Sequence, residues 1–342
     1  MPKFASVLAV SLFSAFLVLG PGCEKGGSDS GAPPVGPAEK AGAAAHTVPA
    51  GAKPKIAFVS NNASDFWNIA RKGIEKAQKE LKIQVDFKAP QPESIQGQVR
   101  ILEDLESQGY NGIAISVLHS SDMNSTLNRL SKKLNLITHD SDAPESGRIA
   151  YIGTNNFQAG EMLGREVAKL FPKSVKMAFF VGTISADNAR QRRDGVLKAL
   201  TDANITVDVV ALKEDNKDMT KAVTNVEDVL NAHADVQLLV GLWAYNPPAI
   251  AKAVKNAGKK EIKIVGFDEY DETLQAIKDG GIACTIAQKP FEFGYQSSKL
   301  LHELCTKGAA AVPQDPIIDT GVTVVVSANV DEFWNHLKEL KK

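Results

Sequence analysis

Cysteine, net charge and catalytic motifs are all scarce in this chain. Its 342 residues include three cysteines, too few for a disulfide framework or a four-ligand zinc site. The formal net charge is −1, which offers no basic stripe to phosphate backbones, so we expect no nucleic acid partner. The six histidines lack metal-ligand spacing, and no G-x-S-x-G, Walker or H-E-x-x-H motif is present. The sequence therefore predicts no enzyme, no metal and no cofactor.

The N-terminus has the pattern of an exported protein. Lys3 precedes an apolar run from Phe4 to Gly20, and a Gly-Pro-Gly turn leads into Cys23. This is a secretory signal pattern, slightly short for a membrane span. Cys23 resembles the lipidated cysteine of a bacterial lipobox, although Leu19 stands one place too far from it. We expect residues 1–23 to be a signal peptide and Cys23 to carry a lipid, with simple cleavage and release as the alternative.

Residues 24–53 are rich in Gly, Ala, Pro and Ser and show no apolar period. We expect a flexible linker with an end-to-end distance on the order of 30 Å. Such a linker would keep a folded body close to a membrane, so the predicted location is the periplasm or the outer side of the cytoplasmic membrane. Cys284 and Cys305 lie in the folded part, and we expect two buried thiols there, with one disulfide as the alternative.

From Lys55 onward, short apolar runs alternate with amphipathic stretches of helical period. This alternation is typical of βαβ units that build a parallel sheet. One series ends at the strand LNLITHD, and a second, similar series starts after IAYIGTNN and ends at IACTIAQK. The fold class is therefore α/β, with two consecutive lobes, each a parallel sheet flanked by helices.

The C-terminal segment starts no third series. It offers a helix at 291–307, an extended segment TGVTVVVS and a helix at 331–340, which we expect to complete the two earlier sheets. The chain would then cross between lobes near Gly153, Gln288 and Thr320 and form a multi-strand hinge. The predicted N-terminal lobe is 54–154 plus 289–318, and the C-terminal lobe is 155–288 plus 319–342.

In open parallel sheets, ligands bind beyond the carboxyl ends of the strands. The residues that the pattern places there are polar and aromatic. They are Ser60 to Trp67, Ser116, His139 to Asp142, Ser185 to Arg193, Trp243 to Asn246, Phe267 to Glu269, and Gln288.

From Lys55 to about Ser327 the chain resembles the ribose and galactose type of periplasmic sugar-binding protein, the type I solute receptors of ABC transporters. Five stretches carry the resemblance, in the order and spacing of that family. They are DFWNIARKGIEKA, ITHDSDAP, GRIAYIGTNNFQAGEMLG, ADNARQRRDGV and IVGFDEYDETLQAIKDGGIACTIAQKPFEFGY. The resemblance implies a two-lobed fold with three crossovers, a sugar ligand bound by hinge closure, and an ABC transporter permease as partner.

Six residues match ligand-binding positions of that family. A sugar ring needs aromatic faces for its CH surface and bidentate polar groups for its hydroxyls. The resemblance assigns these roles to Phe66, Trp67, Asp140, Arg192, Asp268 and Gln288.

Five of these assignments have a structural alternative. Phe66 and Trp67 could both pack into a core, although adjacent residues cannot share one helix face. Asp140 and Asp268 could only organise a turn or cap a helix. Arg192 stands three residues before Gly195, as in the family, whereas most helical arginines are simply solvated.

Three positions depart from a ribose-type site. Ser141 stands where Arg is usual, and Ser116 and Trp243 stand where Asn is usual. Trp243, Tyr245 and Asn246 add aromatic and polar groups from the second lobe, while Ser60, Ser116 and Ser141 lie at strand ends of the first. We therefore expect a pentose, hexose or polyol other than ribose.

Other functions fit the residues less well. Asp140 and Asp268 could be a carboxylate pair for glycoside hydrolysis, but they belong to different predicted lobes. Regulators of the lactose-repressor type share the fold but carry an N-terminal helix-turn-helix, where this chain has a signal pattern. A receptor that signals to a membrane histidine kinase or a chemoreceptor stays open as an alternative to a transporter component. We expect a monomer.

Overall fold

The computed structural model describes residues 45–64 and 66–341. The predicted signal peptide, Cys23 and most of the linker lie outside these residues. Within them, no helix is both long and apolar enough to cross a membrane. The described residues form a single compact unit.

The first sheet of the described chain has six strands in the order β11-β5-β4-β3-β1-β2, and all of its pairings are parallel. Its strands are β1 (Ile56–Val59), β2 (Val85–Lys88), β3 (Gly112–Ile115), β4 (Asn135–His139), β5 (Tyr151–Gly153) and β11 (Ile317–Asp319). Its helices are α1 (Phe66–Leu81), α2 (Ile95–Ser107), α3 (Ser120–Ser131) and α9 (Pro290–Lys307).

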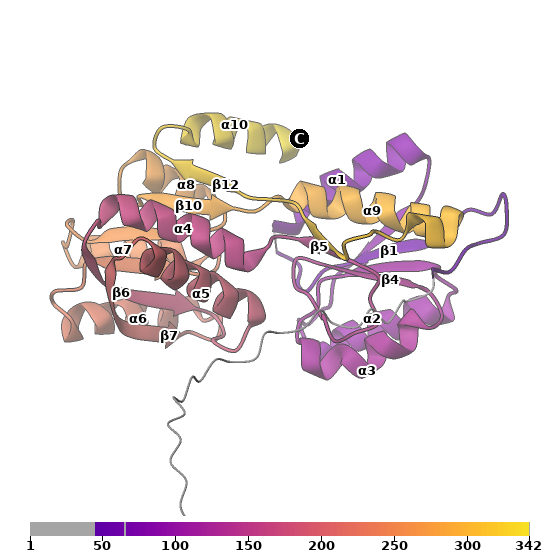
Figure 1. The fold of residues 1–342 in the computed structure, drawn as a ribbon, viewed down its shortest axis with the longest axis horizontal. Helices are drawn as coiled ribbons and strands as arrows, with labels where there is room; N and C mark the ends of the chain where they lie inside the picture. The colour runs from indigo at the N-terminus through magenta and orange to yellow at the C-terminus, as the bar shows by residue number, and fades with distance from the viewer. Residues whose placement is uncertain (1–44, 65, 342) are drawn as a thin grey trace, which may run out of the picture. The chain divides into compact units, whose positions relative to one another are not determined.

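Two helices cover each face of this sheet (Figure 1). Ile56 and Phe58 of β1 pack with α1 and α9, whereas Ala57 and Val59 pack with α2 and α3. Successive side chains of a strand point to opposite faces, so both faces of β1 are buried. The burial of both faces explains why the sequence of β1 is a continuous apolar run.

The second sheet has the order β12-β10-β9-β8-β6-β7 and is parallel except for β12, which runs antiparallel to β10. Its strands are β6 (Ser174–Val181), β7 (Thr206–Glu214), β8 (Leu238–Gly241), β9 (Lys263–Phe267), β10 (Cys284–Ala287) and β12 (Thr323–Val326). Its helices are α4 (Asn156–Leu170), α5 (Asp187–Asp202), α6 (Met219–Ala232), α7 (Asn246–Asn256), α8 (Asp271–Lys278) and α10 (Val330–Lys341), and a short 3-10 helix, Gly308–Ala311, follows α9.

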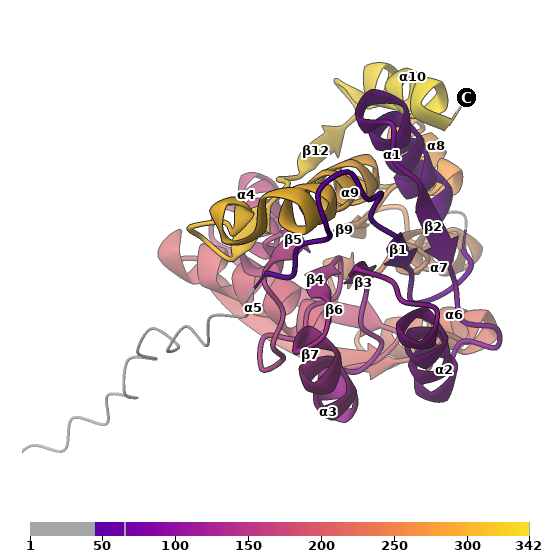
Figure 2. The same ribbon diagram turned by 90° about the vertical axis from the view of Figure 1, so that its right-hand side faces the viewer.

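The chain passes between the two sheets at three places. These are the links from β5 to α4, from β10 to α9 and from β11 to β12, near Gly153, Gln288 and Thr320. The backbone N–H of Thr320 donates to the carbonyl of Gly153 over 2.9 Å, which ties the first link to the third. The predicted two-lobed parallel fold is confirmed. The exact lobe boundaries stay a prediction, because α10 contacts both α8 and α1 (Figure 2).

The sequence did not reveal strand β11. Its three residues, Ile317–Asp319, pair with β5 at the sheet edge, and Ile317 is exposed. An exposed edge strand carries no buried apolar run, so periodicity cannot detect it. The two cysteines of the described chain, Cys284 and Cys305, are free and buried, as expected.

Glycines allow α4 and α5 to pack closely. A Cβ atom added at Gly195 would lie 2.1 Å from the carbonyl oxygen of Phe157, and one at Gly160 would lie 2.2 Å from that of Arg192. Real Cβ atoms do not approach backbone atoms so closely, so α4 and α5 can pack at this distance only because these positions are glycines. The position of α5, which carries Arg192, therefore depends on Gly195.

We predict that Gly195→Ala lowers the free energy of unfolding by about 1–3 kcal/mol or more, because α4 and α5 must separate. The measurement is chemical denaturation of the protein without sugar. Lys198→Ala, on the exposed face of α5, is the matched control and should change stability by less than about 0.5 kcal/mol. Equal stability of Gly195→Ala and wild type would contradict this account of the helix contact.

Candidate functional site

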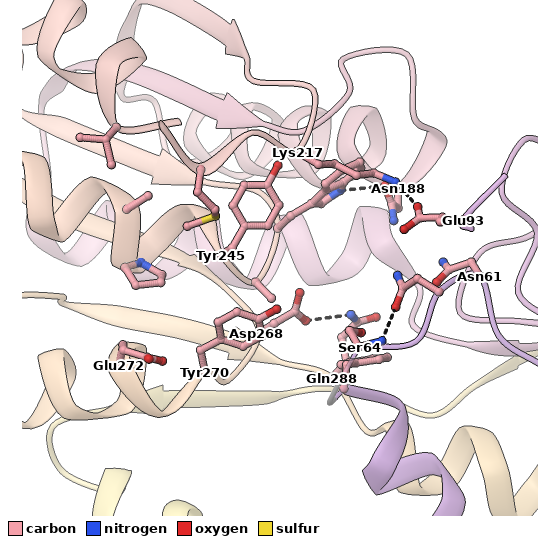
Figure 3. Close-up of a pocket in the computed structure, with 18 of the residues that line it drawn as sticks. Asn61, Ser64, Glu93, Asn188, Lys217, Tyr245, Asp268, Tyr270, Glu272 and Gln288 are labelled. Carbon is pink, nitrogen blue, oxygen red and sulfur yellow. Dashed lines mark hydrogen bonds and ion pairs between the residues drawn. The ribbon is translucent and has the colours of Figure 1, made fainter. Parts of the chain in front are cut away.

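A large cavity of about 1200 Å³ lies at the carboxyl ends of the strands, between the two sheets. We call it the cleft. It is lined by Asn61, Asn62, Ala63, Ser64, Phe66, Trp67, Glu93, Asp140, Asn188, Arg192, Lys217, Met219, Thr220, Val223, Thr224, Glu227, Trp243, Ala244, Tyr245, Pro248, Ala249, Lys252, Asp268, Tyr270, Glu272 and Gln288. Figure 3 shows residues of the first lobe, such as Asn61 and Ser64, facing residues of the second, such as Tyr245 and Tyr270.

Two aspartates occupy equivalent positions in the two lobes. Asp140 directly follows β4 and Asp268 directly follows β9. Both have left-handed backbone conformations, with φ values of 56° and 67°. Non-glycine residues rarely adopt this region, and functional sites are enriched in such backbone. Each turn aims a carboxyl group from the end of a buried strand into the cleft.

Asp140 is held by donors of the first lobe. Its Oδ2 atom accepts hydrogen bonds from Ser116 Oγ at 2.7 Å and from Asn61 Nδ2 at 3.4 Å. The Tyr151 hydroxyl donates to the Asp140 carbonyl at 2.9 Å and fixes the backbone turn. Burial raises the pKa of Asp140 to about 6, opposed by the Ser116 hydrogen bond and the charge of Arg192. This carboxyl group therefore titrates near neutral pH.

Asp268 lies in a charged cluster of the second lobe. Gln288 Nε2 donates to its Oδ1 at 2.8 Å, and Arg192 Nη1 lies 3.6 Å from its Oδ2 (Figure 3 shows the Gln288 contact). Burial raises the pKa of Asp268, while Arg192 and Gln288 oppose that rise. The cluster joins β9, α5 and the crossover after β10.

Arg192 is charged, yet only 2 % of its surface is exposed to solvent. Its Nε donates to Asn156 Oδ1 at 2.9 Å and its Nη1 donates to the Leu242 carbonyl at 2.8 Å. The guanidinium carbon lies 4.5 Å from the centre of the Phe267 ring, in cation–π geometry. Arg192 is therefore not one of the solvated helical arginines, whereas Arg190 is exposed on the same helix.

Aromatic side chains line the cleft from both lobes. Phe66 and Trp67 form an edge-to-face pair with ring centres 5.1 Å apart, and both line the cleft, although Trp67 is only 2 % exposed. On the second lobe Trp243 and Tyr245 lie against Gly182, where an added Cβ would come within 2.1 Å of the Trp243 ring. The absence of a side chain at Gly182 makes room for these rings.

Four predicted residues do not line the cleft but support it. Ser60 donates to the Asn62 carbonyl at 2.6 Å, and Ser116 donates to Asp140. Ser141 forms an antiparallel backbone bridge with His139, outside the named strands. Asn246 is 1 % exposed and donates to Asp215 Oδ2 at 3.0 Å. Their predicted contacts with ligand stay predictions.

Asp215 organises the aromatic wall of the second lobe. Its carboxylate accepts hydrogen bonds from the Tyr245 hydroxyl at 2.5 Å and from the Lys217 backbone at 2.8 Å. Burial raises the pKa of Asp215, and burial together with this hydrogen bond raises that of Tyr245 well above its usual value. The hydrogen bond to Asp215 holds the Tyr245 hydroxyl in place, so Tyr245 is part of the wall.

The sequence did not single out several lining residues. Lys217 forms an ion pair with Glu93 of the other lobe, and Asn188 accepts a hydrogen bond from the Trp243 indole at 3.2 Å (Figure 3). Asn188 lies within the strand-end range that the sequence indicated. Lys217 and Glu93 lie in loops whose charged residues look like any solvated surface, and only their closeness in space reveals them.

The cleft offers acceptors that the protein leaves unpaired. Asn61 Oδ1 and Gln288 Oε1 are buried and have no hydrogen-bond partner among the described residues. Such atoms cost free energy unless a ligand or water donates to them. No group of three or more His, Cys, Asp or Glu side chains in the described part of the chain could hold a metal ion. A hydroxyl donor on a neutral ligand fits the Asn61 oxygen, which lines only the cleft.

Two parallel α/β lobes, three crossovers and a polar, aromatic cleft between the strand ends define a solute receptor. The chain belongs to the periplasmic binding protein domain family, whose model matches residues 56–309. Several of its relatives are named as binding proteins for sugars.

Three known proteins illustrate the relationship. The D-allose-binding periplasmic protein of Escherichia coli is 28 % identical over 73 % of this chain and 83 % of its own length. A solute-binding protein from Burkholderia graminis, solved with D-arabinose, is 31 % identical, with a TM-score of 0.73 over 81 % of this chain and 96 % of its own. The XylFII–LytSN complex contains a chain that is 27 % identical, with a TM-score of 0.71 over 81 % of this chain and 99 % of its own.

We predict that Asp140→Asn changes the pH dependence of folding stability. The folded pKa of about 6 exceeds the unfolded value of 3.8, so the stability that Asp140 contributes is fully present below pH 3.8 and lost as pH rises through 6. The asparagine variant, neutral at every pH, should gain roughly 2.4 kcal/mol in stability relative to wild type between pH 4 and pH 8. Urea unfolding without sugar at several pH values measures this.

Asp104→Asn, which changes an exposed carboxylate on α2, is the matched control. Its stability relative to wild type should stay nearly constant over the same range. If the Asp140→Asn difference is also independent of pH, the burial argument for Asp140 is wrong.

Proposed function

We propose that this chain is the substrate-binding component of an ABC-type importer and captures a monosaccharide, either a pentose, a hexose or a polyol, by hinge closure. The observation that carries the proposal is the convergence of Asp140, Arg192, Asp268 and Gln288 on one cleft, opposite aromatic rings. Carboxylates and an amide oxygen accept from sugar hydroxyls, while the guanidinium donates to ring and hydroxyl oxygens. The rings supply flat apolar faces for the sugar CH groups.

The ligand that we propose is not ribose. Ser116 stands where an asparagine would be usual. Its hydroxyl donates a hydrogen bond to the Asp140 carboxylate. Trp243 occupies another such position and presents an indole ring with its N–H already bonded to Asn188. These two changes replace amide groups with a hydroxyl and an aromatic face, which favours a ligand with a larger apolar face than ribose.

The second candidate function is sugar sensing. A relative of this chain is present in the XylFII–LytSN complex, together with a second protein. A receptor that passes its closed state to a membrane histidine kinase or chemoreceptor would use the same cleft. Pull-down of the sugar-loaded protein with its genomic neighbours separates the two functions, because a permease and a sensor are different partners.

We further propose that the protein is exported and that Cys23 anchors it by a lipid, with residues 24–53 as the tether. The monomeric state is part of the same proposal. Mass spectrometry of the protein from its native membrane fraction tests the anchor, since a diacylglycerol on Cys23 adds a defined mass and release without lipid does not.

We predict that the body, residues 53–342, gains thermal stability when it binds its sugar. A ligand at about 100 times its Kd stabilises by about 2.7 kcal/mol, because it binds only the folded state. A melting panel of pentoses, hexoses and polyols, on protein freed of bound sugar, measures the shift. No shift with any member would contradict the proposed ligand class, and turnover of any sugar would favour the enzyme alternative.

We predict that Arg192→Ala and Asp268→Ala each weaken sugar binding by more than tenfold. Each change removes a ligand contact and leaves its buried partner unpaired. Calorimetry with the sugar found in the panel gives the Kd, and circular dichroism verifies the fold. Arg190→Ala, on an exposed arginine of the same helix, is the control and should bind as wild type does. Wild-type affinity in both test variants would show that the site assignment is wrong.

A further inference from the structure

A second cavity, of about 580 Å³, lies behind the crossovers. We call it the rear cavity. Lys289 and Thr323 of the crossover segments line it, together with Ile69 of α1 and Leu337 of α10. Figures 1 and 2 both show α10 beside α1 on this side of the molecule. Gln288 lines the rear cavity and also the cleft, so its side chain stands in the wall between them.

The rear cavity contains a buried carboxyl group that the sugar site does not use. Glu269 is 6 % exposed, and its Oε2 atom has no hydrogen-bond partner among the described residues. Gln288 Oε1, from the wall, is buried and equally without a partner there. The left-handed turn at Asp268 sends that residue to the cleft and its neighbour Glu269 to the rear cavity. Two acceptors without donors point to a ligand that donates.

The remaining surface of the rear cavity is largely apolar. Phe291, Phe333 and Leu337 line it, and all three pack in or against one hydrophobic cluster. Its volume lies within the ordinary range of small-molecule sites. An apolar wall with a few convergent polar groups is the usual composition of such a site.

We propose that the rear cavity is a second small-molecule site that binds a primary amine with an apolar body. The ammonium group donates to Glu269 Oε2 and Gln288 Oε1. The apolar body packs against Phe291, Phe333 and Leu337. A cation fits better than a neutral donor, because hydrogen bonds between two charged groups are about twice as strong as neutral ones. This site is separate from the sugar cleft and does not depend on which sugar the cleft binds.

The charges around Glu269 determine the pH dependence of the proposed binding. Burial and the charge of Asp268 raise the pKa of Glu269 to about 8, while Lys341 and Arg192 oppose that rise. The other charged or titratable groups that line the rear cavity are Lys76, Lys289, Glu292, Glu332 and His336. An ammonium ligand needs the carboxylate form, so its affinity should increase as pH rises from 6 to 8.

The test uses benzylamine and phenethylamine as probes, with benzyl alcohol and 2-phenylethanol as neutral controls of the same shape. Ligand-observed NMR and calorimetry on the body, residues 53–342, give the Kd of each probe. We expect the amines to bind at least tenfold more tightly than the alcohols at pH 8. The amine affinity should fall by up to about tenfold per pH unit below that.

Glu269→Gln should remove the preference for amine over alcohol and flatten the pH dependence. Asp140→Asn is the matched control, because it changes a carboxyl group of the cleft and should leave amine binding intact. Phe333→Ala provides a second variant, independent of the buried acid, and should weaken amine binding at least fivefold. Melting curves verify that each variant folds.

Three results would overturn the proposal. The first is that amines and alcohols bind equally, or that neither binds up to about 10 mM, which leaves the acceptors to water alone. The second is that Glu269→Gln and Phe333→Ala both bind benzylamine as wild type does. The third is that Asp140→Asn abolishes amine binding, which would place the probe in the cleft.

Discussion

The buried guanidinium of Arg192 is the interaction on which the cleft depends. A charge at 2 % exposure costs several kcal/mol unless partners satisfy it. Asn156 at the start of α4, the Leu242 carbonyl after β8 and Asp268 after β9 supply those partners. Three separate segments of the second lobe therefore meet at one side chain. The position of that side chain depends in turn on the close contact of α5 with α4 at Gly195.

The charge balance of the cleft follows from this arrangement. Asp140 and Asp268 face one arginine, and Asp140 feels the charges of both Arg192 and Asp268. Burial disfavours ionisation of both aspartates, while Arg192 favours it. A neutral ligand rich in hydroxyl groups relieves this conflict, because it donates to both carboxylates without adding charge. An anionic ligand would add a third negative group, so the charges of the site favour a neutral ligand over an anionic one.

Much of this arrangement could be predicted from the sequence, because it follows from strand ends. Asp140 and Asp268 each terminate a buried apolar run, and a parallel sheet brings the ends of its strands together. Arg192 could be chosen among neighbouring arginines only through the family register with Gly195. Periodicity alone gives no reason for Arg192 of α5 to be buried while Arg190 is exposed.

Other features depend on contacts between residues far apart in the chain. Ser116 and Asn246 each hydrogen-bond to an aspartate that shapes the wall, and their contact with ligand stays a prediction. Which polar residue touches ligand and which one supports it depends on side-chain direction, and that is fixed by packing. The pairing of Lys217 with Glu93 joins loops more than a hundred residues apart, so no local pattern contains it.

The consecutive acids Asp268 and Glu269 show how one backbone conformation serves two surfaces. In extended backbone, neighbouring side chains already point to opposite sides, but a left-handed residue at the strand end also turns the chain sharply. Asp268 thereby reaches Arg192 and Gln288, while Glu269 lines the rear cavity without a partner for its Oε2 atom. Gln288 uses its amide nitrogen for Asp268 and leaves its amide oxygen unpaired. A donor that binds this oxygen from the rear would hold the nitrogen toward the cleft, and any resulting change of affinity would be the same for both cavities, because linkage is reciprocal.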